Sequence, residues 1–177
     1  MNRPVRTAQP EPSATAVASS SSLARDLVAA AAVATTAAFA GGALLTQTVI
    51  VPHWRSMEPV AFLDHFATYG PAVGATLFPI EVIATLALTA STYRAVRNRR
   101  PGRGLWAMAT ACMVGTLLLL PIYFAGANTA MLRENFPVTS VAGELADWYA
   151  WNWARTGLAL LATVVCCFAI RTIRPTR

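Results

Sequence analysis

Residues 105–127 read LWAMATACMVGTLLLLPIYFAGA and contain no charged side chain. A helix needs about 20 consecutive apolar residues to cross the hydrocarbon layer of a bilayer, and this stretch exceeds that length. It therefore predicts a membrane-spanning helix, and it sets the fold class for the rest of the chain.

Three more apolar runs accompany this stretch, at residues 27–51, 72–93 and 151–172. The last run reaches spanning length only if its helix starts upstream of the uncharged segment 156–170, near Trp151. The chain has 177 residues, of which 55% are hydrophobic and only 12% charged, and this is too apolar for an average soluble domain. We expect an all-α fold, a four-transmembrane-helix bundle.

A single membrane domain, residues 23–173, contains the four predicted spans. The segment 1–22 is rich in Ser, Ala, Pro and Thr and has little to bury, so we expect a disordered cytoplasmic tail. The tripeptide AFA at 38–40 resembles a signal-peptidase site, but the apolar run continues to Val51, which favours a span over a cleaved signal peptide. All cysteines lie inside predicted spans, so no disulfide framework is expected.

The distribution of arginine along the chain indicates its topology. All 14 basic residues are arginine, and the net charge is +6. Most arginines precede the first span, fill the connection 94–103 or follow the last span, whereas acids outnumber them in the other two connections. The positive-inside rule then places both termini and the 94–103 connection in the cytoplasm. This topology explains the charge without a nucleic-acid partner and favours a bacterial plasma membrane.

The two connections on the outer side have predicted structure of their own. Pro52 is expected to end the first span, because proline cannot continue helical hydrogen bonding. The stretch 58–77 then places Phe62, Phe66 and Tyr69 at helical spacing, which predicts a short amphipathic helix at the outer interface before the second span. The fourth helix is expected to start near Ser140, with Thr139 or Ser140 as its cap, and to run into the membrane without interruption.

Polar side chains of three predicted spans lie at a similar depth, just below the outer surface. One face of the fourth helix carries the following residues: Glu144, Trp148, Trp151, Asn152 and Arg155. Gln47, near the end of the first span, and Asn128, at the end of the third, reach the same level. We therefore expect polar and aromatic side chains of the three helices to meet in a shared hollow, and the candidate site residues at this level are Gln47, Asn128, Trp148, Trp151, Asn152 and Arg155.

Glu81 lies near the middle of the second span, where an ionised side chain is costly and is expected to face the bundle interior. Its only partner in the outer half is Arg155. Two interpretations remain open. Glu81 is a functional residue, or it is a structural tie that is protonated, or paired to Arg155 through water, and holds the helices in register.

The two histidines, His53 and His65, lie on the outer side, close to Glu58 and Asp64. Their spacing matches no recognised metal-ligand motif, and solvated loop histidines are the simpler interpretation. Either imidazole can still serve as a general base near neutral pH. A haem between them requires both rings to face one cavity, so the sequence assigns no metal and leaves the cofactor open.

Two segments of the chain resemble the anthrone-oxygenase-like family of small four-span membrane proteins. These segments are NTAMLR at 128–133 and WYAWNWART at 148–156. In that family an Asn ends the third span, and a W-x-x-W-N-x-x-R-T pattern opens the fourth. The resemblance covers about residues 28–172, and this chain has Trp153 where many relatives have His.

This resemblance implies an O2-dependent monooxygenase, cofactor-free or metal-dependent, for a flat aromatic molecule of polyketide type or another lipophilic small molecule. Trp148 and Trp151 would then stack the ring, and Gln47 and Asn128 would complete the binding site. The roles of oxyanion stabilisers and general base would go to these residues: Asn152 and Arg155 as stabilisers, and His53, His65 or Glu81 as the base.

The competing interpretation is a non-enzymatic four-helix membrane subunit, scaffold or carrier, with Glu81 and Arg155 as a structural tie. An open polar cavity that reaches Glu81 favours the enzyme or a carrier. A packed interior in which Glu81 bonds only to its neighbours favours the structural interpretation. Neither interpretation specifies an oligomeric state.

Overall fold

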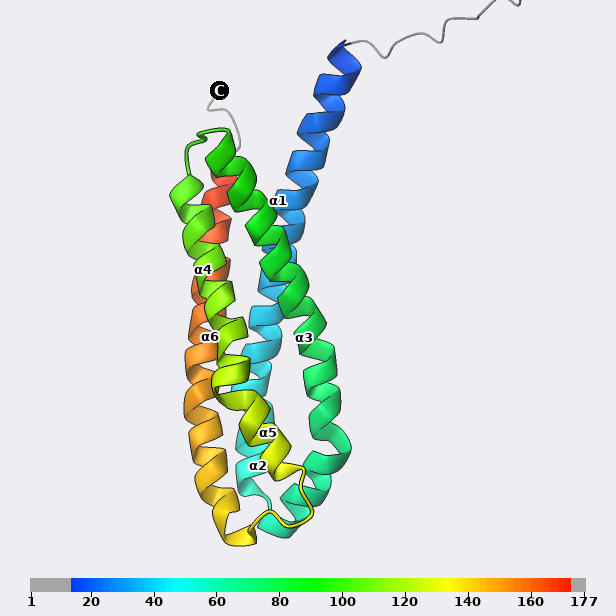
Figure 1. Cartoon of the computed structure of the whole chain (residues 1–177), viewed down its shortest axis with the longest axis vertical. Coiled ribbons are helices and arrows are strands. Elements are labelled where there is room, and N and C mark those ends of the chain that lie inside the picture. Colours follow the sequence, from blue (N-terminus) through cyan, green and yellow to red (C-terminus); the bar gives the residue numbers. More distant parts are fainter. Residues whose placement is uncertain (1–13, 173–177) are drawn as a thin grey trace, which may run out of the picture.

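The computed structural model describes residues 14–172, and all their side chains except those of residues 14–22 and 25. Every regular element in this part of the chain is helical (Figure 1). In chain order the elements are α1 (Ala14–Leu45), η1 (Thr46–Ile50), α2 (Val51–Ser56), α3 (Pro59–Arg97), α4 (Arg103–Leu119), η2 (Leu120–Phe124), α5 (Ala125–Met131), η3 (Val138–Ser140) and α6 (Val141–Arg171).

The described chain contains 4 helical stretches that are long and apolar enough to cross a membrane. This confirms the predicted number of spans. They are Asp26–Ser56, Pro59–Arg97, Arg103–Met131 and Val138–Arg171. Helix α1 packs against α3 and α6, and α4 packs against the same two helices, so α3 and α6 occupy opposite corners of the bundle.

The two ends of the bundle differ in composition. The "arginine end" comprises the end of α3, the start of α4 and the end of α6, and it contains the connection 94–103. The start of α1 lies on this side as well (Figure 1). The "tryptophan end" comprises α2, the start of α3, α5 and the start of α6, and it carries Trp54, Trp148, Trp151 and Trp153.

The predicted tail overlaps the first helix. Residues 1–13 lie outside the described residues, whereas 14–22, also assigned to the disordered tail, form the first turns of α1. Alanine has the highest helix propensity, and extending an existing helix costs far less than nucleating one. The helix of the span therefore continues into this segment.

Pro52 does not end the first helix, contrary to the prediction. The helix widens into the π-helical turn η1, in which the backbone N–H of Val51 donates to the carbonyl of Thr46, and Pro52 sits in the first turn of α2, where a missing N–H costs nothing. Pro121 is also associated with a π-helical turn, but it lies inside that turn, as the second residue of η2. At both prolines the helix continues, with a π-helical turn beside or around the proline.

The predicted interfacial helix is the beginning of a much longer one. Helix α3 runs without interruption for 39 residues, through Pro71 and Pro79. Phe62 and Phe66 are buried as their spacing predicts, but Tyr69 is exposed. Helix α6 begins beside Ser140, as predicted, although the serine hydroxyl makes no capping hydrogen bond.

The core has two parts with different packing. In the half toward the arginine end it is made mostly of small residues: Ala29, Ala32, Ala40, Ala84, Ala95, Ala109, Ala159, Ala162 and Ala169. In the half toward the tryptophan end it is made mostly of large side chains: Trp54, Phe62, Phe66, Phe124, Met131, Leu145 and Trp148. Small residues let helix backbones approach closely, whereas rings hold them apart.

Candidate functional site

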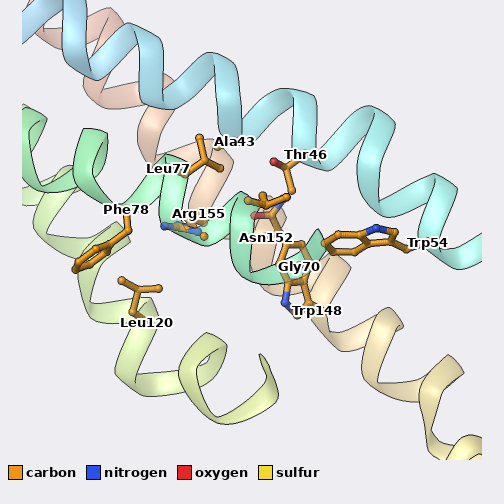
Figure 2. Close-up of a pocket in the computed structure, with 12 residues that line it drawn as sticks. Ala43, Thr46, Trp54, Gly70, Leu77, Phe78, Leu120, Trp148, Asn152 and Arg155 are labelled. Atoms are coloured by element: carbon orange, nitrogen blue, oxygen red, sulfur yellow. The ribbon is translucent and has the colours of Figure 1, made fainter. Parts of the chain in front are cut away.

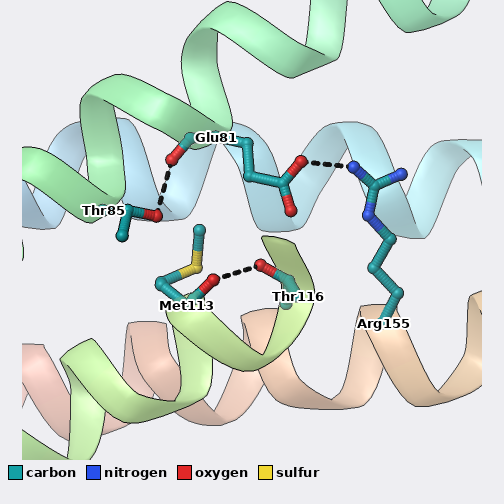
Figure 3. A network of polar contacts seen from close by, with 5 residues as sticks. All are labelled: Glu81, Thr85, Met113, Thr116 and Arg155. Carbon is teal, nitrogen blue, oxygen red and sulfur yellow. Dashed lines mark hydrogen bonds and ion pairs between the residues drawn. The ribbon is translucent and has the colours of Figure 1, made fainter. Parts of the chain in front are cut away.

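An ion pair joins the two helices at opposite corners of the bundle. The Nη2 atom of Arg155, on α6, lies 2.5 Å from Oε2 of Glu81, on α3 (Figure 3). Glu81 is 0% exposed and Arg155 9%. The predicted pairing is therefore present, as a direct contact. The pair crosses the interior of the bundle between α1 and α4. Both charged groups are therefore shielded from the medium outside the bundle.

The pair leaves hydrogen-bonding capacity unused. Oε1 of Glu81 and Nε of Arg155 are buried, and neither has a partner among the described residues. The guanidinium instead faces two rings, with its Cζ 5.1 Å from the centroid of Phe39 and 5.4 Å from that of Phe124. Arginine carries five N–H donors. Buried donors without an acceptor are costly, and they make this guanidinium a good partner for an added acceptor.

The predicted layer of amides and indoles forms beside this pair. Asn152 donates from Nδ2 to Oε1 of Gln47 across 2.6 Å, and Gln47 donates from Nε2 to the carbonyl of Tyr149 across 3.4 Å. The indole N–H of Trp148 donates to Oδ1 of Asn128 across 3.0 Å. Spans one, three and four are thus joined by side-chain hydrogen bonds at this level, as the sequence predicts.

A cavity of about 60 Å³ adjoins Arg155 (Figure 2). It is lined by Ala43, Thr46, Trp54, Gly70, Val73, Gly74, Leu77, Phe78, Leu120, Trp148, Asn152 and Arg155. A site for a drug-sized ligand measures about 300–1,000 Å³, and one water needs at least about 10–15 Å³. The cavity therefore accommodates a few waters, dioxygen or the edge of a larger ring.

Several predicted site residues do not line this cavity. Glu81 lies behind Arg155, and Gln47 and Asn128 contact the lining residues Asn152 and Trp148 from outside. Trp151 is 38% exposed and stacks on Tyr123 at a centroid distance of 5.4 Å. Trp151 lies at the edge of the predicted face of α6. Its stacking partner Tyr123 belongs to the adjacent η2, and this contact keeps the Trp151 side chain outside the cavity.

The histidines form a pair of their own, away from Arg155. The rings of His53 and His65 lie edge to face with centroids 6.1 Å apart, and His65 also contacts Tyr69 at 4.8 Å. Neither ring lines the cavity. Residues 14–172 contain no group of three or more His, Cys, Asp or Glu side chains that could hold a metal ion.

Helix α3 supplies much of the cavity wall, through residues that were not among the predicted site residues. Gly70 and Gly74 are four residues apart and Phe78 follows at the same spacing, so the three share one helix face. Trp54, from α2, closes the other end of the cavity. The recurrence of small residues at helical spacing is a signal for close helix approach, and it would have singled out this face.

The chemistry available at the cavity is that of a buried cation, with an N–H that has no partner among the described residues, in an apolar enclosure. Such groups stabilise an oxyanion far better than they do in water. No carboxylate or imidazole is among the residues that line the cavity. The site can thus bind and stabilise an anion, while a proton acceptor must come from elsewhere.

Comparison of the chain with protein-family models, with curated proteins and with solved structures found no match.

Proposed function

We propose that the protein is an integral membrane oxygenase that binds a lipophilic, flat hydroxyaromatic molecule beside Arg155. The observation that carries this proposal is a buried guanidinium that lines a cavity and has an N–H without an acceptor. The resemblance to anthrone oxygenases, on Trp148, Asn152 and Arg155, supports the same chemistry.

The surroundings of Arg155 suit one edge of an aromatic ring. Trp54 and Trp148 lie at one end of the cavity with their ring centroids 5.6 Å apart, and Phe78 lies at the other end. Aromatic walls favour a flat ring through edge-to-face and stacked contacts. The substrate's oxygen would accept hydrogen bonds from Arg155, and Asn152 would border the same oxygen.

The reaction requires O2 and no other oxidant. With an anthrone, ionisation of the ring CH₂ yields a delocalised anion, which Arg155 stabilises on its oxygen. The anion transfers electrons to O2. One oxygen atom becomes the new ring carbonyl, and the other leaves as water with the two ring hydrogens. Because the residues that line the cavity offer no base, the proton passes to one of the few waters that the cavity accommodates, and stabilisation of the anion by Arg155 drives the ionisation.

Turnover of an anthrone by the reconstituted protein under oxygen tests this proposal. The informative variant is Arg155→Met combined with Glu81→Leu, since removing a buried pair together often preserves folding. We expect its turnover to fall by about 100-fold or more, the typical effect of losing an oxyanion donor. Arg133→Met, which removes an exposed arginine, is the matched control and should retain full activity. Wild-type turnover in the double variant would overturn the role of Arg155, and inactive wild-type protein would overturn the function.

A second candidate function is that of a non-enzymatic membrane subunit, scaffold or carrier. The favouring observation is that Glu81 is fully buried, that its carboxylate bonds to Arg155 alone among the described residues, and that it does not line the cavity. This matches a structural tie between α3 and α6. In that case wild-type protein shows no turnover or binding of a hydroxyaromatic molecule, and changes at Glu81 or Arg155 affect stability alone.

A further inference from the structure

We infer that the cavity opens sideways into the lipid, through a mouth formed by Gly74, Phe78 and Leu120. The ligand then enters from the hydrocarbon layer, where it is dissolved, and its polar edge advances to Arg155. This inference rests on the proposed function for the identity of the ligand. The position of the mouth rests on the structure alone.

The residues that line the cavity are buried on one side of it and exposed on the other. Trp54, Trp148, Asn152 and Arg155 are buried and form its floor. Gly74 is exposed, and Phe78 is 48% exposed. Figure 2 shows Phe78 and Leu120 on the side of Arg155 away from Trp54. The open side of the cavity is therefore the side framed by Phe78, Gly74 and Leu120.

The surface around this mouth is apolar. Phe78 lies close to the middle of the 39-residue helix α3, one turn before Glu81. Between His65 and Glu81 the helix carries no charged or titratable residue except Tyr69, which lies further toward the tryptophan end. On the other side of the mouth, Leu120 is followed by the apolar sequence of η2. A mouth at this depth, without polar groups, faces acyl chains.

The wall of α3 has room and flexibility at the mouth. A Cβ atom added at Gly74 would meet nothing within 4 Å. Pro71 and Pro79 lie on either side of Gly74 and each remove one helical hydrogen bond. Local bending of this segment widens the entrance, so a ring larger than the present cavity can insert its edge while the remainder stays in the lipid.

The first experiment tests the mouth without reference to any ligand. A spin label is attached to Gly74→Cys, in full-length protein whose three native cysteines are replaced by alanine, in phosphatidylcholine vesicles. Collision rates with lipid-soluble O2 and with a water-soluble nickel chelate are then compared. We expect the label to collide with O2 and to be shielded from the chelate. A label that the chelate reaches would overturn the lipid mouth.

The second experiment tests whether the mouth is the ligand's route. The probe is a dihydroxyanthraquinone, the product class of the proposed reaction, and its arrival from vesicle lipid is followed by quenching of tryptophan fluorescence. Gly74→Leu fills the mouth, and we expect it to lower the association rate by about tenfold or more. The matched control is Gly157→Leu, an exposed helical glycine on α6 whose Cβ also meets nothing within 4 Å. It should associate at the wild-type rate.

The outcomes separate the route from the function. Binding to wild type with an unchanged rate in Gly74→Leu would overturn the route and leave the function standing. Absence of binding to wild type would overturn the proposed function, together with the entry of this ligand class. If the label at residue 74 faces lipid, and if binding is slowed in Gly74→Leu but not in Gly157→Leu, both the route and the function are supported.

Discussion

The two halves of the bundle are built from the same four helices but packed in different ways. Toward the arginine end the helices meet through alanines, and buried hydroxyls bond within their own helix, as Thr36 does to Ala32 and Ser91 to Ala87. Toward the tryptophan end, rings separate the helices, and buried polar groups bond across them, as in the pair of Gln47 and Asn152.

This difference shows what helix separation does in an apolar protein. Close backbones leave little space for long polar side chains, and the guanidinium of Arg155 lies where the two halves meet, against Phe39 of one cluster and Phe124 of the other. Separated backbones leave a cavity, and the polar groups that reach into this space must find partners on other helices. Candidate chemistry therefore lies in the tryptophan half and at its junction with the alanine half. Both π-helical turns, each associated with a proline, also lie there or at its edge.

The largest expected effect comes from breaking the ion pair between Glu81 and Arg155. Arg155→Ala leaves the Glu81 carboxylate buried without a partner, and we expect a loss of about 3–5 kcal/mol in the free energy of unfolding. The measurement is reversible unfolding in mixed micelles. Arg155→Met with Glu81→Leu should lose much less, because no unpaired charge remains. A single variant as stable as wild type would show that the tie contributes nothing.

The next effect tests the close packing of the alanine half. Ala162→Leu inserts a large side chain where exposure is 0%, and we expect it to destabilise the fold by about 1–3 kcal/mol. Ala154→Leu is the matched control on the exposed side of the same helix and should change stability by less than about 0.5 kcal/mol. Equal effects of the two variants in thermal unfolding would contradict the close-packed core.

A smaller effect is expected from one hydrogen bond across the separated half. Asn128→Ala removes the acceptor of the Trp148 indole N–H, and we expect a cost of about 1 kcal/mol, since half-buried Asn128 leaves a position that water can occupy. The emission of Trp148 should also shift. Asn135→Ala, in the exposed connection before η3, is the control. If Asn128→Ala and Asn135→Ala change stability and emission equally, the bond between Trp148 and Asn128 does not stabilise the protein.

The smallest change in stability is expected from substituting two glycines, one in each half of the bundle. Gly74→Ala should stabilise the protein by about 0.4–1 kcal/mol, because the helix accepts alanine and the Cβ meets open space. Gly102→Ala, in the turn at the arginine end, should destabilise it, because φ is 80° there and the new Cβ would collide with Thr172. Unfolding of both variants in the same detergent measures the two changes in stability, which should have opposite signs. A destabilised Gly74→Ala would show that the mouth is closed.

Local sequence patterns were sufficient for the spans and for part of the site. Hydropathy located the four helices, and helical spacing placed Trp148, Asn152 and Arg155 on one buried face. The same spacing placed Trp151 on that face, but residues at its edge turn toward whichever neighbour is closer, and Tyr123 holds Trp151 outward. Spacing along one helix cannot determine this choice.

The sequence by itself determined the number of long apolar helices and the level along the bundle at which the polar groups of three of them meet. These properties follow from the length of apolar runs and from the rise of a helix. Only the tertiary structure decided that Arg155 contacts Glu81 directly, that the histidines stay apart from both and that glycines of α3 line the cavity. Rotation of each helix about its axis and the separation between helices set these contacts, and both depend on all four helices packing at once.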